Sequence, residues 1–207
     1  MEKQMIISIG RECGSGGCEI GTILAEHYGI KLYDRNLISS LAQELHKDPE
    51  ALEKLEEKVT GKLSPYIRKN GFSAKVGAIG DKYTESDRIF MTERALISHL
   101  AEAESFVIIG RAANSILADH PNALRLFIYA SEEFKLPRVK AQFNLQDDHE
   151  ARKIMHKTDK ERREYFEFYS DMVWGSTDGH DFMLDSSIFG IEETAKIIME
   201  LADRKFK

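Results

Sequence analysis

The stretch Met5-Ile-Ile-Ser-Ile-Gly-Arg-Glu-Cys-Gly-Ser-Gly-Gly-Cys-Glu-Ile-Gly-Thr-Ile-Leu-Ala-Glu-His-Tyr-Gly-Ile-Lys-Leu-Tyr-Asp34 decides the fold of this chain. It opens with an apolar, β-branched run that is too short for a helix and is typical of a strand buried on both faces. Four glycines follow within eight residues, at Gly10, Gly14, Gly16 and Gly17. Apolar residues then recur at helical spacing, and Gly29 stands where a helix C-cap is expected. The stretch therefore predicts a strand, a glycine-rich turn (residues 10–17) and a helix.

The glycine-rich turn is a candidate phosphate-binding loop. Its backbone can approach an anion closely, and the helix that follows offers the N–H groups of its first turn. The spacing nearly fits the pattern G-x-x-x-x-G-K-[ST], but Gly10 lies one residue too early for the first glycine. Gly17 and Cys18 stand where that pattern has its lysine and its Mg²⁺-binding hydroxyl. The alternative is a turn that only permits tight packing of the helix on the strand.

Composition limits the class of protein. A chain of 207 residues with 42% hydrophobic and 31% charged residues is typical of a soluble globular protein with one sizeable core. The formal net charge of −6 argues against broad binding of nucleic acid or of a membrane surface, and no apolar run is long enough for a transmembrane helix. The two cysteines, Cys13 and Cys18, favour free thiols in a reducing cytoplasm. The sequence leaves the oligomeric state open.

Predicted strands and helices alternate along the rest of the chain. Strands are expected at 30–33, 105–109, 124–129 and 182–185, and helices at 35–45, 48–59, 87–103, 131–143, 148–156, 159–168 and 191–204. This alternation favours an α/β fold with a mostly parallel sheet between two layers of helices. Residues 60–86 follow neither period and carry spaced glycines and basic side chains, which predicts a functional or mobile insertion.

Three polar segments each follow a predicted strand directly: the glycine-rich turn, Asp34-Arg35 and Gly110-Arg111. The carboxyl ends of parallel strands meet at one edge of the sheet, where ligands bind. We therefore expect one shared site. Arg111 suits an anionic ligand because its planar guanidinium binds phosphate through two hydrogen bonds, and its alternative role is a structural ion pair with a carboxylate at the sheet edge.

The chain resembles the cytidylate-kinase-like branch of the P-loop nucleoside monophosphate kinases. The resemblance covers nearly the whole chain in the family's order, through residues 9–21, 32–34, 107–112, 126–133, 159–162 and 182–187, together with Tyr165, Tyr169 and Trp174. It implies a three-layer α/β/α fold of the P-loop NTPase type with a mostly parallel five-stranded sheet. It also implies a single domain over residues 1–207, with a mobile insertion at about 60–86 and a lid at about 135–163.

The resemblance implies ATP and Mg²⁺ as cofactors, and phosphoryl transfer to a nucleoside monophosphate, CMP or dCMP above all. The residues implied for the donor phosphates are Gly10, Cys13, Gly14, Ser15, Gly16, Gly17, Cys18 and Glu19. Those implied for the acceptor are Asp34, Arg35, Arg111 and Asp159. Because glycine replaces the loop lysine, the charge on the moving phosphate must be met by Mg²⁺ and by Arg11, Lys135, Arg138 and Arg162. The carboxylates near enough in sequence to reach Mg²⁺ are those of Glu12, Glu19 and Asp34.

Departures from the family pattern leave two alternatives open. Besides Gly17, Ala112 stands where an Asp usually follows the Gly-Arg pair, Lys135 replaces a lid arginine, and Met155 replaces a basic residue. One alternative is a kinase of another small molecule, and the other is a nucleotide-binding regulatory protein without turnover. The intact order of the loop, acceptor and lid segments favours the nucleoside monophosphate kinase.

Two further expectations concern the lid. Its cations and those of the insertion should repel one another until polyphosphate binds, which predicts mobility; they are Arg68, Lys69, Lys75, Lys135, Arg138 and Arg162. Aromatic residues near the end of the lid are expected to be mainly core, with at most one touching a ligand; they are Tyr165, Phe166, Phe168, Tyr169 and Trp174.

Overall fold

The computed structural model describes residues 4–47 and 84–206. The strands are β1 (Ile6–Arg11), β2 (Lys31–Tyr33), β3 (Phe106–Ile109), β4 (Ala123–Tyr129) and β5 (Phe182–Asp185). The helices are α1 (Gly17–Tyr28), α2 (Arg35–Lys47), α5 (Glu85–Ala103), α6 (Ala113–Ile116), α7 (Glu132–Phe143), α8 (Asp148–Tyr169) and α9 (Ser186–Phe206), with a short 3₁₀ turn at Thr177–Gly179.

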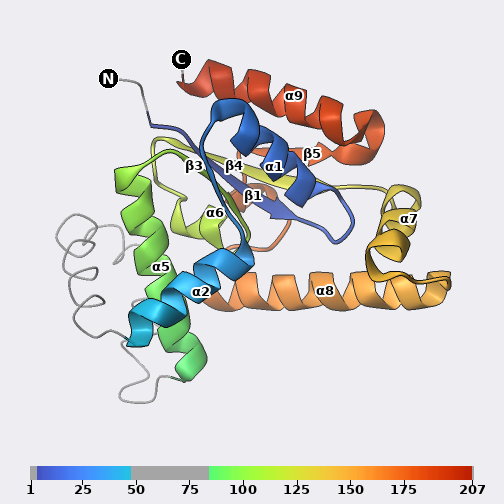
Figure 1. The fold of residues 1–207 in the computed structure, drawn as a ribbon, viewed down its shortest axis with the longest axis horizontal. Coiled ribbons are helices and arrows are strands. Elements are labelled where there is room, and N and C mark those ends of the chain that lie inside the picture. Colours follow the sequence, from blue (N-terminus) through green and yellow to red (C-terminus); the bar gives the residue numbers. More distant parts are fainter. Residues whose placement is uncertain (1–3, 48–83, 207) are drawn as a thin grey trace.

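The five strands form one sheet in the order β2-β3-β1-β4-β5, and each of its pairings is parallel. Helices α1 and α9 cover one face, and α2, α5 and α6 cover the other (Figure 1). This arrangement confirms the predicted three-layer α/β/α fold. The carboxyl ends of β1, β2 and β3 lie at the same edge, because Ile9 pairs with Ile109 and Tyr33 pairs with Ile108.

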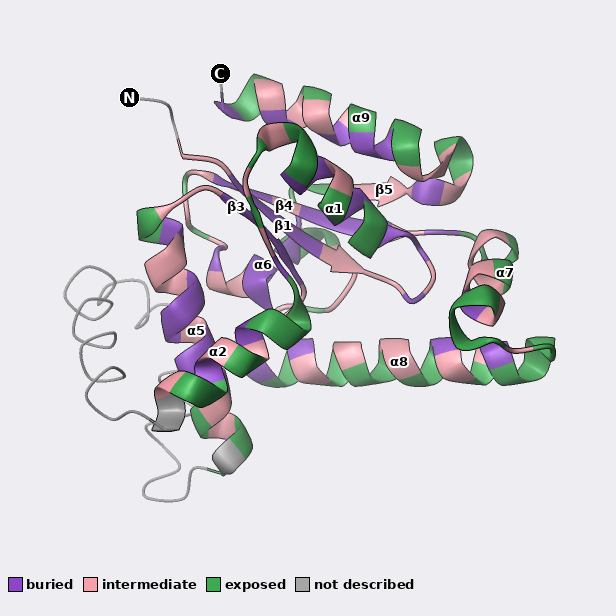
Figure 2. Cartoon of the chain, in the orientation of Figure 1, coloured by how far each residue is buried: buried purple, intermediate pink, exposed green. Residues whose placement is uncertain are grey.

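The central strand shows why the first apolar run is continuous. Ile6 packs into the cluster under α2 and α5, whereas Ile7 and Ile9 pack into the cluster under α1 and α9. Ser8 points to the α6 side, where its hydroxyl donates a hydrogen bond to Oδ1 of Asn114. Both faces of the strand are therefore buried, and Figure 2 shows the same burial along most of the central strands β1, β3 and β4.

Side-chain hydrogen bonds explain two of the departures from the predicted helix boundaries, at the start of α5 and within α8. Helix α5 begins at Glu85, because Thr84 and Asp87 form a capping box, so Ser86 lies inside the helix. Residues 148–169 form one helix instead of two, capped at its start by Asp147. Asp159 suggested a second start, but its carboxylate accepts a hydrogen bond from the distant Cys13 N–H. The predicted helix at 48–59 and most of the segment 60–86 lie outside the described residues.

The remaining parts of the fold are helix α9 and the segment that contains α7 and α8. Helix α9 is interrupted at Gly190 (φ 81°, ψ 175°), so the regular helix starts at Ile191, as predicted. Helices α7 and α8 contain the predicted lid segment at about 135–163, for which the name lid is kept, and the buried side chains of Val139, Ala151 and Met155 pack this segment against Cys13. None of the helices within residues 4–47 and 84–206 combines the length and the apolar character needed to cross a membrane.

Candidate functional site

The glycine-rich turn forms a cradle of backbone groups at the start of α1. Gly14 and Gly16 both have φ of 80°, and Gly16 is the N-cap residue of α1 without a side-chain cap. The first-turn N–H groups of α1 are thus not capped by the N-cap side chain, which is the arrangement that suits an anion. Ser15 braces the turn: its hydroxyl donates to the Glu12 carbonyl (2.9 Å), and its own carbonyl accepts from the Ser186 hydroxyl (2.6 Å).

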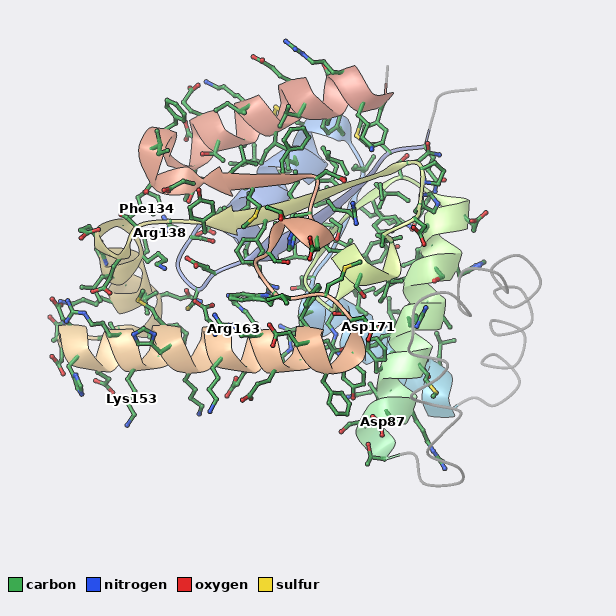
Figure 3. The ribbon with its side chains drawn as sticks, turned by 180° about the vertical axis from the view of Figure 1, so that it is seen from behind. Asp87, Phe134, Arg138, Lys153, Arg163 and Asp171 are labelled. Atoms are coloured by element: carbon green, nitrogen blue, oxygen red, sulfur yellow. The ribbon has the colours of Figure 1, made fainter. Side chains whose placement is uncertain are left out.

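The lid contacts this turn through charged side chains. Lys135 Nζ lies 2.7 Å from Glu12 Oε2, and the Arg138 guanidinium pairs with Glu19 and donates to the Gly14 carbonyl (3.0 Å). Figure 3 shows Arg138 beside Phe134 on α7, with Arg138 Cζ 5.5 Å from the centroid of the Phe134 ring. The lid cations of α7 are therefore held at the turn by carboxylates.

The expected repulsion between lid cations is wrong for the described part of the set. Lys135 and Arg138 have the partners given above, and Arg162 Nη1 lies 3.3 Å from Asp159 Oδ1. Carboxylates from the turn and from α8 thus neutralise the positive charge that the sequence concentrates here. Arg68, Lys69 and Lys75 lie outside the described residues.

Asp159 acts on the turn from α8. Its Oδ1 accepts the Cys13 N–H at 2.7 Å, and the neighbouring Arg162 donates to the Arg11 carbonyl at 3.2 Å. Burial raises the pKa of Asp159 above its ordinary value, against the lowering effect of the Cys13 hydrogen bond and of Arg162. Asp159 is not among the residues that line the cavity described next, so its visible role is to hold the turn.

A cavity of about 370 Å³ opens at the carboxyl ends of β1, β2 and β3. The three polar segments predicted to converge all contribute to its walls, and α8 closes it from the other side. Its chemically distinctive lining residues are Arg11, Cys18, Asp34, Arg35, Asn36, Arg111, Asn114, Thr158, Glu161, Arg162, Tyr165, Phe166, Trp174 and His180. Gly10 lines it as well, whereas the other proposed donor-phosphate residues, Cys18 excepted, lie in the adjacent turn and at the start of α1.

Cations outnumber carboxylates around this cavity. Four arginines face two acidic residues, Asp34 and Glu161. One oxygen of Asp34 also accepts the Leu37 N–H at 2.8 Å and so caps the first turn of α2. The balance favours an anionic ligand.

Arg111 forms a structural ion pair, which is the alternative role that the sequence left open, but its partner Glu93 lies on helix α5 instead of the sheet edge. Its Nε donates to Glu93 Oε2 at 3.0 Å, and the same oxygen accepts the Tyr165 hydroxyl at 2.9 Å. The other Glu93 oxygen accepts from Ser39 at 3.1 Å, and the Tyr165 ring lies 4.4 Å from Arg111 Cζ. Glu93 is fully buried and escaped prediction, although it stands on the apolar face of α5 between Phe90 and Ile97.

The backbone that carries Arg111 is strained. Gly110, Arg111 and Ala112 have φ of 79°, 53° and 53°, and the Ala113 N–H closes the turn on the Gly110 carbonyl at 3.0 Å. Non-glycine residues rarely adopt a positive φ, and such strain concentrates at functional sites. The turn brings Arg111 into the wall of the cavity while Glu93 holds its guanidinium.

An aromatic wall completes the cavity. Phe127 packs edge-on against Trp174 and His180, with ring centroids 5.0 Å apart in both pairs. His180 Nδ1 lies 2.6 Å from the Ser176 carbonyl, and burial lowers the pKa of His180, which favours the neutral ring. The expectation that the aromatic residues near the end of the lid are core is confirmed for Phe166 and Tyr169, which are buried in one cluster. Phe166 also lines the cavity, together with Tyr165 and Trp174. Phe168 is 65% exposed, so it was wrongly assigned to the core.

The site fits phosphate groups better than a metal ion held by protein alone. Within residues 4–47 and 84–206 no group of three or more His, Cys, Asp or Glu side chains is placed to hold a metal. Mg²⁺ is commonly bound through one or two carboxylates together with substrate phosphates. Glu12 and Glu19 lie at the turn where such phosphates would bind, and both now pair with lid cations.

Comparisons with known proteins bear on the fold and the family of the chain. No protein of curated function gives a significant match. An uncharacterized protein from Eubacterium ventriosum superposes with a TM-score of 0.73 at 29% identity, over 97% of this chain and 99% of that chain.

Two kinases share the fold at lower identity. A shikimate kinase from Acinetobacter baumannii in complex with shikimate has a TM-score of 0.50 at 18% identity, over 100% of this chain and 97% of that chain. A gluconokinase from Sinorhizobium meliloti has a TM-score of 0.50 at 16% identity, over 100% and 95%. The sequence model of the cytidylate kinase-like family matches residues 6–188, so the chain belongs to that family.

Proposed function

We propose that the protein transfers a phosphoryl group from ATP to a nucleoside monophosphate, with CMP or dCMP the preferred acceptor. The observation that carries this proposal is that the glycine-rich turn and the arginine-rich cavity adjoin each other at one edge of the sheet. The glycine-rich turn supplies an anion cradle at the start of α1, and its residues Gly10 and Arg11 also line the arginine-rich cavity. Phosphoryl transfer requires this adjacency of donor and acceptor sites, because it depends on holding two phosphates in line.

The donor side is assigned to the glycine-rich turn and the lid. Backbone N–H groups between Cys13 and Cys18 would hold the ATP phosphates, and Lys135 and Arg138 would exchange their carboxylate partners for phosphate oxygens. That exchange would free Glu12 and Glu19 to approach Mg²⁺, which supplies charge neutralisation when it is bound. The present pairs at Lys135 and Arg138 support this role, since they already place both cations at the turn.

The acceptor side is assigned to the cavity. Arg35 and Arg162 contribute positive charge for binding the acceptor phosphate. Arg111 contributes positive charge as well, from the position in which its ion pair with Glu93 holds it. The aromatic wall of Tyr165 and Trp174 suits a planar base, because aromatic faces stack on bases with little sequence preference. A volume of about 370 Å³ lies within the range of small-molecule sites.

A coupled assay of ADP release across a panel of acceptors tests the proposal. The panel contains CMP, dCMP, UMP, AMP and GMP, together with shikimate and gluconate. We expect ADP release that depends on acceptor and is fastest with CMP or dCMP. Arg35→Ala should raise the KM for CMP more than the KM for ATP, while Lys153→Ala is the matched control, because Lys153 is exposed and points away from the sheet (Figure 3). ADP release at the same rate without any acceptor would refute the transfer.

A second acceptor class is favoured by one observation. Glu93 engages Arg111, and Ala112 provides no carboxylate at the position after it. An acceptor other than a nucleotide would then be recognised mainly by Arg35, Arg162 and the polar side chains of the cavity. Activity with shikimate or gluconate but with none of the monophosphates would identify this class. Tight ADP binding in calorimetry with no turnover on the panel would identify a regulatory protein.

A further inference from the structure

Arg11 occupies the space of a side chain that the glycine-rich turn lacks. A Cβ atom built at Gly17 would lie 2.6 Å from Arg11 Cβ, which is closer than real atoms approach, and 3.1 Å from Arg11 Cγ, which is a tight contact. A Cβ atom at Gly110 would collide with Arg11 Nη1. The arginine stem therefore crosses Gly17, and its guanidinium lies against the end of β3. Gly17 is therefore needed to leave room for the Arg11 stem, whereas Gly110 suits its own φ of 79° and has the flexible end of Arg11 beside it.

The Arg11 guanidinium has unused hydrogen-bonding capacity. Its Nε is buried and finds no hydrogen-bond partner within the described residues. Buried donors in native proteins are nearly always satisfied, so the hydrogen bonding of this guanidinium is incomplete, and because Arg11 lines the cavity it is placed to bind an acceptor that a ligand supplies. Burial lowers the pKa of Arg11, and the positive charge of the neighbouring Arg162 lowers it further. The surroundings therefore favour an anion next to Arg11.

The other candidate cations are already engaged. Lys135 pairs with Glu12, Arg138 with Glu19, and Arg162 with Asp159. Among residues 4–47 and 84–206, no carboxylate forms a salt bridge with Arg11, although Arg11 is the cation carried by the turn itself. Of the four cations considered for the moving phosphate, Arg11 therefore differs from Lys135, Arg138 and Arg162 in having no carboxylate partner among the described residues.

We infer that Arg11 replaces the lysine of the G-x-x-x-x-G-K-[ST] pattern as the cation that binds the terminal phosphates of the donor nucleotide. The lysine of that pattern reaches the β- and γ-phosphates from its seventh position. Here the charge comes from the first position, six residues earlier, and glycine at position 17 leaves room for it. The inference rests on the proposed function, because it assigns a residue to the same donor site.

The test compares single and exchanged variants by calorimetric titration with AMP-PNP, a non-hydrolysable ATP analogue. Arg11→Met keeps the stem over Gly17 and removes the charge, so we expect it to fold as the wild type does and to bind AMP-PNP about 10- to 150-fold more weakly, the range for a lost charge-assisted hydrogen bond. Gly17→Lys alone should also bind poorly, because its side chain collides with Arg11. The double variant Arg11→Gly/Gly17→Lys should recover affinity to within about tenfold of the wild type.

The controls separate this inference from the proposed function. Lys153→Ala should bind AMP-PNP as the wild type does, and thermal melting of each variant checks that it is folded. Wild-type affinity in a folded Arg11→Met protein would overturn the inference while leaving the proposed function intact. A wild-type protein that binds no AMP-PNP would overturn both.

Discussion

Cys13 and Cys18 lie five residues apart in sequence but in different surroundings. Cys13 is buried, and burial raises the pKa of its thiol, whereas Cys18 is exposed in the wall of the cavity. Because the thiolate is the reactive species, we expect one thiol to react rapidly with Ellman's reagent and the other to react only on unfolding. Cys18→Ser should remove the rapid phase, and bound ADP should slow it. Two rapid phases in the folded wild type would contradict this burial.

The ion pair between Glu93 and Arg111 makes a prediction about stability. The Glu93 side chain is fully buried and that of Arg111 is 10% exposed, so truncating one partner leaves a buried charge without compensation. Glu93→Ala should lower the free energy of unfolding by about 3–5 kcal/mol, measured by urea denaturation. Glu93→Gln should cost less, because it still accepts a hydrogen bond from Arg111. A loss below about 0.5 kcal/mol for Glu93→Ala would show that the pair is not maintained in solution.

At the residue scale, the residues of the candidate site that could be predicted are those whose place follows directly from their position in the sequence. Arg35 and Arg111 were found because each lies at or just after the end of a predicted strand. Glu93 and His180 were missed because their roles depend on side chains brought together by tertiary packing. The packing of the Arg11 side chain over Gly17 could not be predicted either, because the sequence alone does not determine the rotamer of Arg11 or the direction in which its side chain points.

Asp159 links helix α8 to the glycine-rich turn and makes a prediction about pH. Burial raises its pKa above the ordinary value of 3.8, so the folded state favours the protonated carboxyl. Its contribution to stability is therefore greatest below pH 3.8 and is lost as pH rises through the raised pKa. Asp159→Asn keeps an acceptor for the Cys13 N–H and removes this titration. The melting temperature of the variant relative to the wild type should rise between pH 3.8 and 7, and a relative fall would show that Arg162 and Cys13 dominate over burial.

Helix α7 is the element expected to respond most to ligand. Its contacts with the turn are Lys135–Glu12 and Arg138–Glu19, and ligand phosphates would compete for both cations. Hydrogen exchange in Glu132–Phe143 should therefore slow when AMP-PNP and CMP are added together. The segment 192–204 of α9 is the internal control and should not change. Equal protection of α7 with and without ligands would favour a rigid binding module over a mobile lid.

The boundaries of the helices could be predicted from the sequence only in part. Gly29 marked the end of α1 correctly, because it adopts a positive φ that glycine tolerates, whereas Gly17 was placed in the turn and is the first residue of the helix. Asp159 misled the division of α8, because an Asp that resembles a helix start instead binds a backbone N–H 146 residues away in sequence. The four-residue helix α6 has no apolar period long enough to detect.

At the scale of the whole molecule, alternation of strands and helices was sufficient to predict a parallel α/β sheet. The sheet edge follows from that topology, since parallel strands bring Arg11, Asp34 and Gly110 together from distant parts of the chain. What topology cannot supply is the identity of the acceptor, which depends on how the cavity walls are shaped by α8 and by residues 174–180. The fold and the position of the candidate site can therefore be predicted from the sequence, whereas the identity of the substrate cannot.

Phosphorus NMR of the complete reaction tests the central claim most directly. The protein is mixed with ATP, Mg²⁺ and CMP, and the phosphorus resonances are followed over time. Transfer at the sheet edge predicts equal losses of the ATP γ-resonance and of the CMP resonance, with the appearance of the α- and β-resonances of ADP and CDP and without inorganic phosphate. Arg35→Ala should slow both changes together. Inorganic phosphate as the only new product, or an unchanged spectrum at high protein concentration, would contradict phosphoryl transfer to a nucleoside monophosphate.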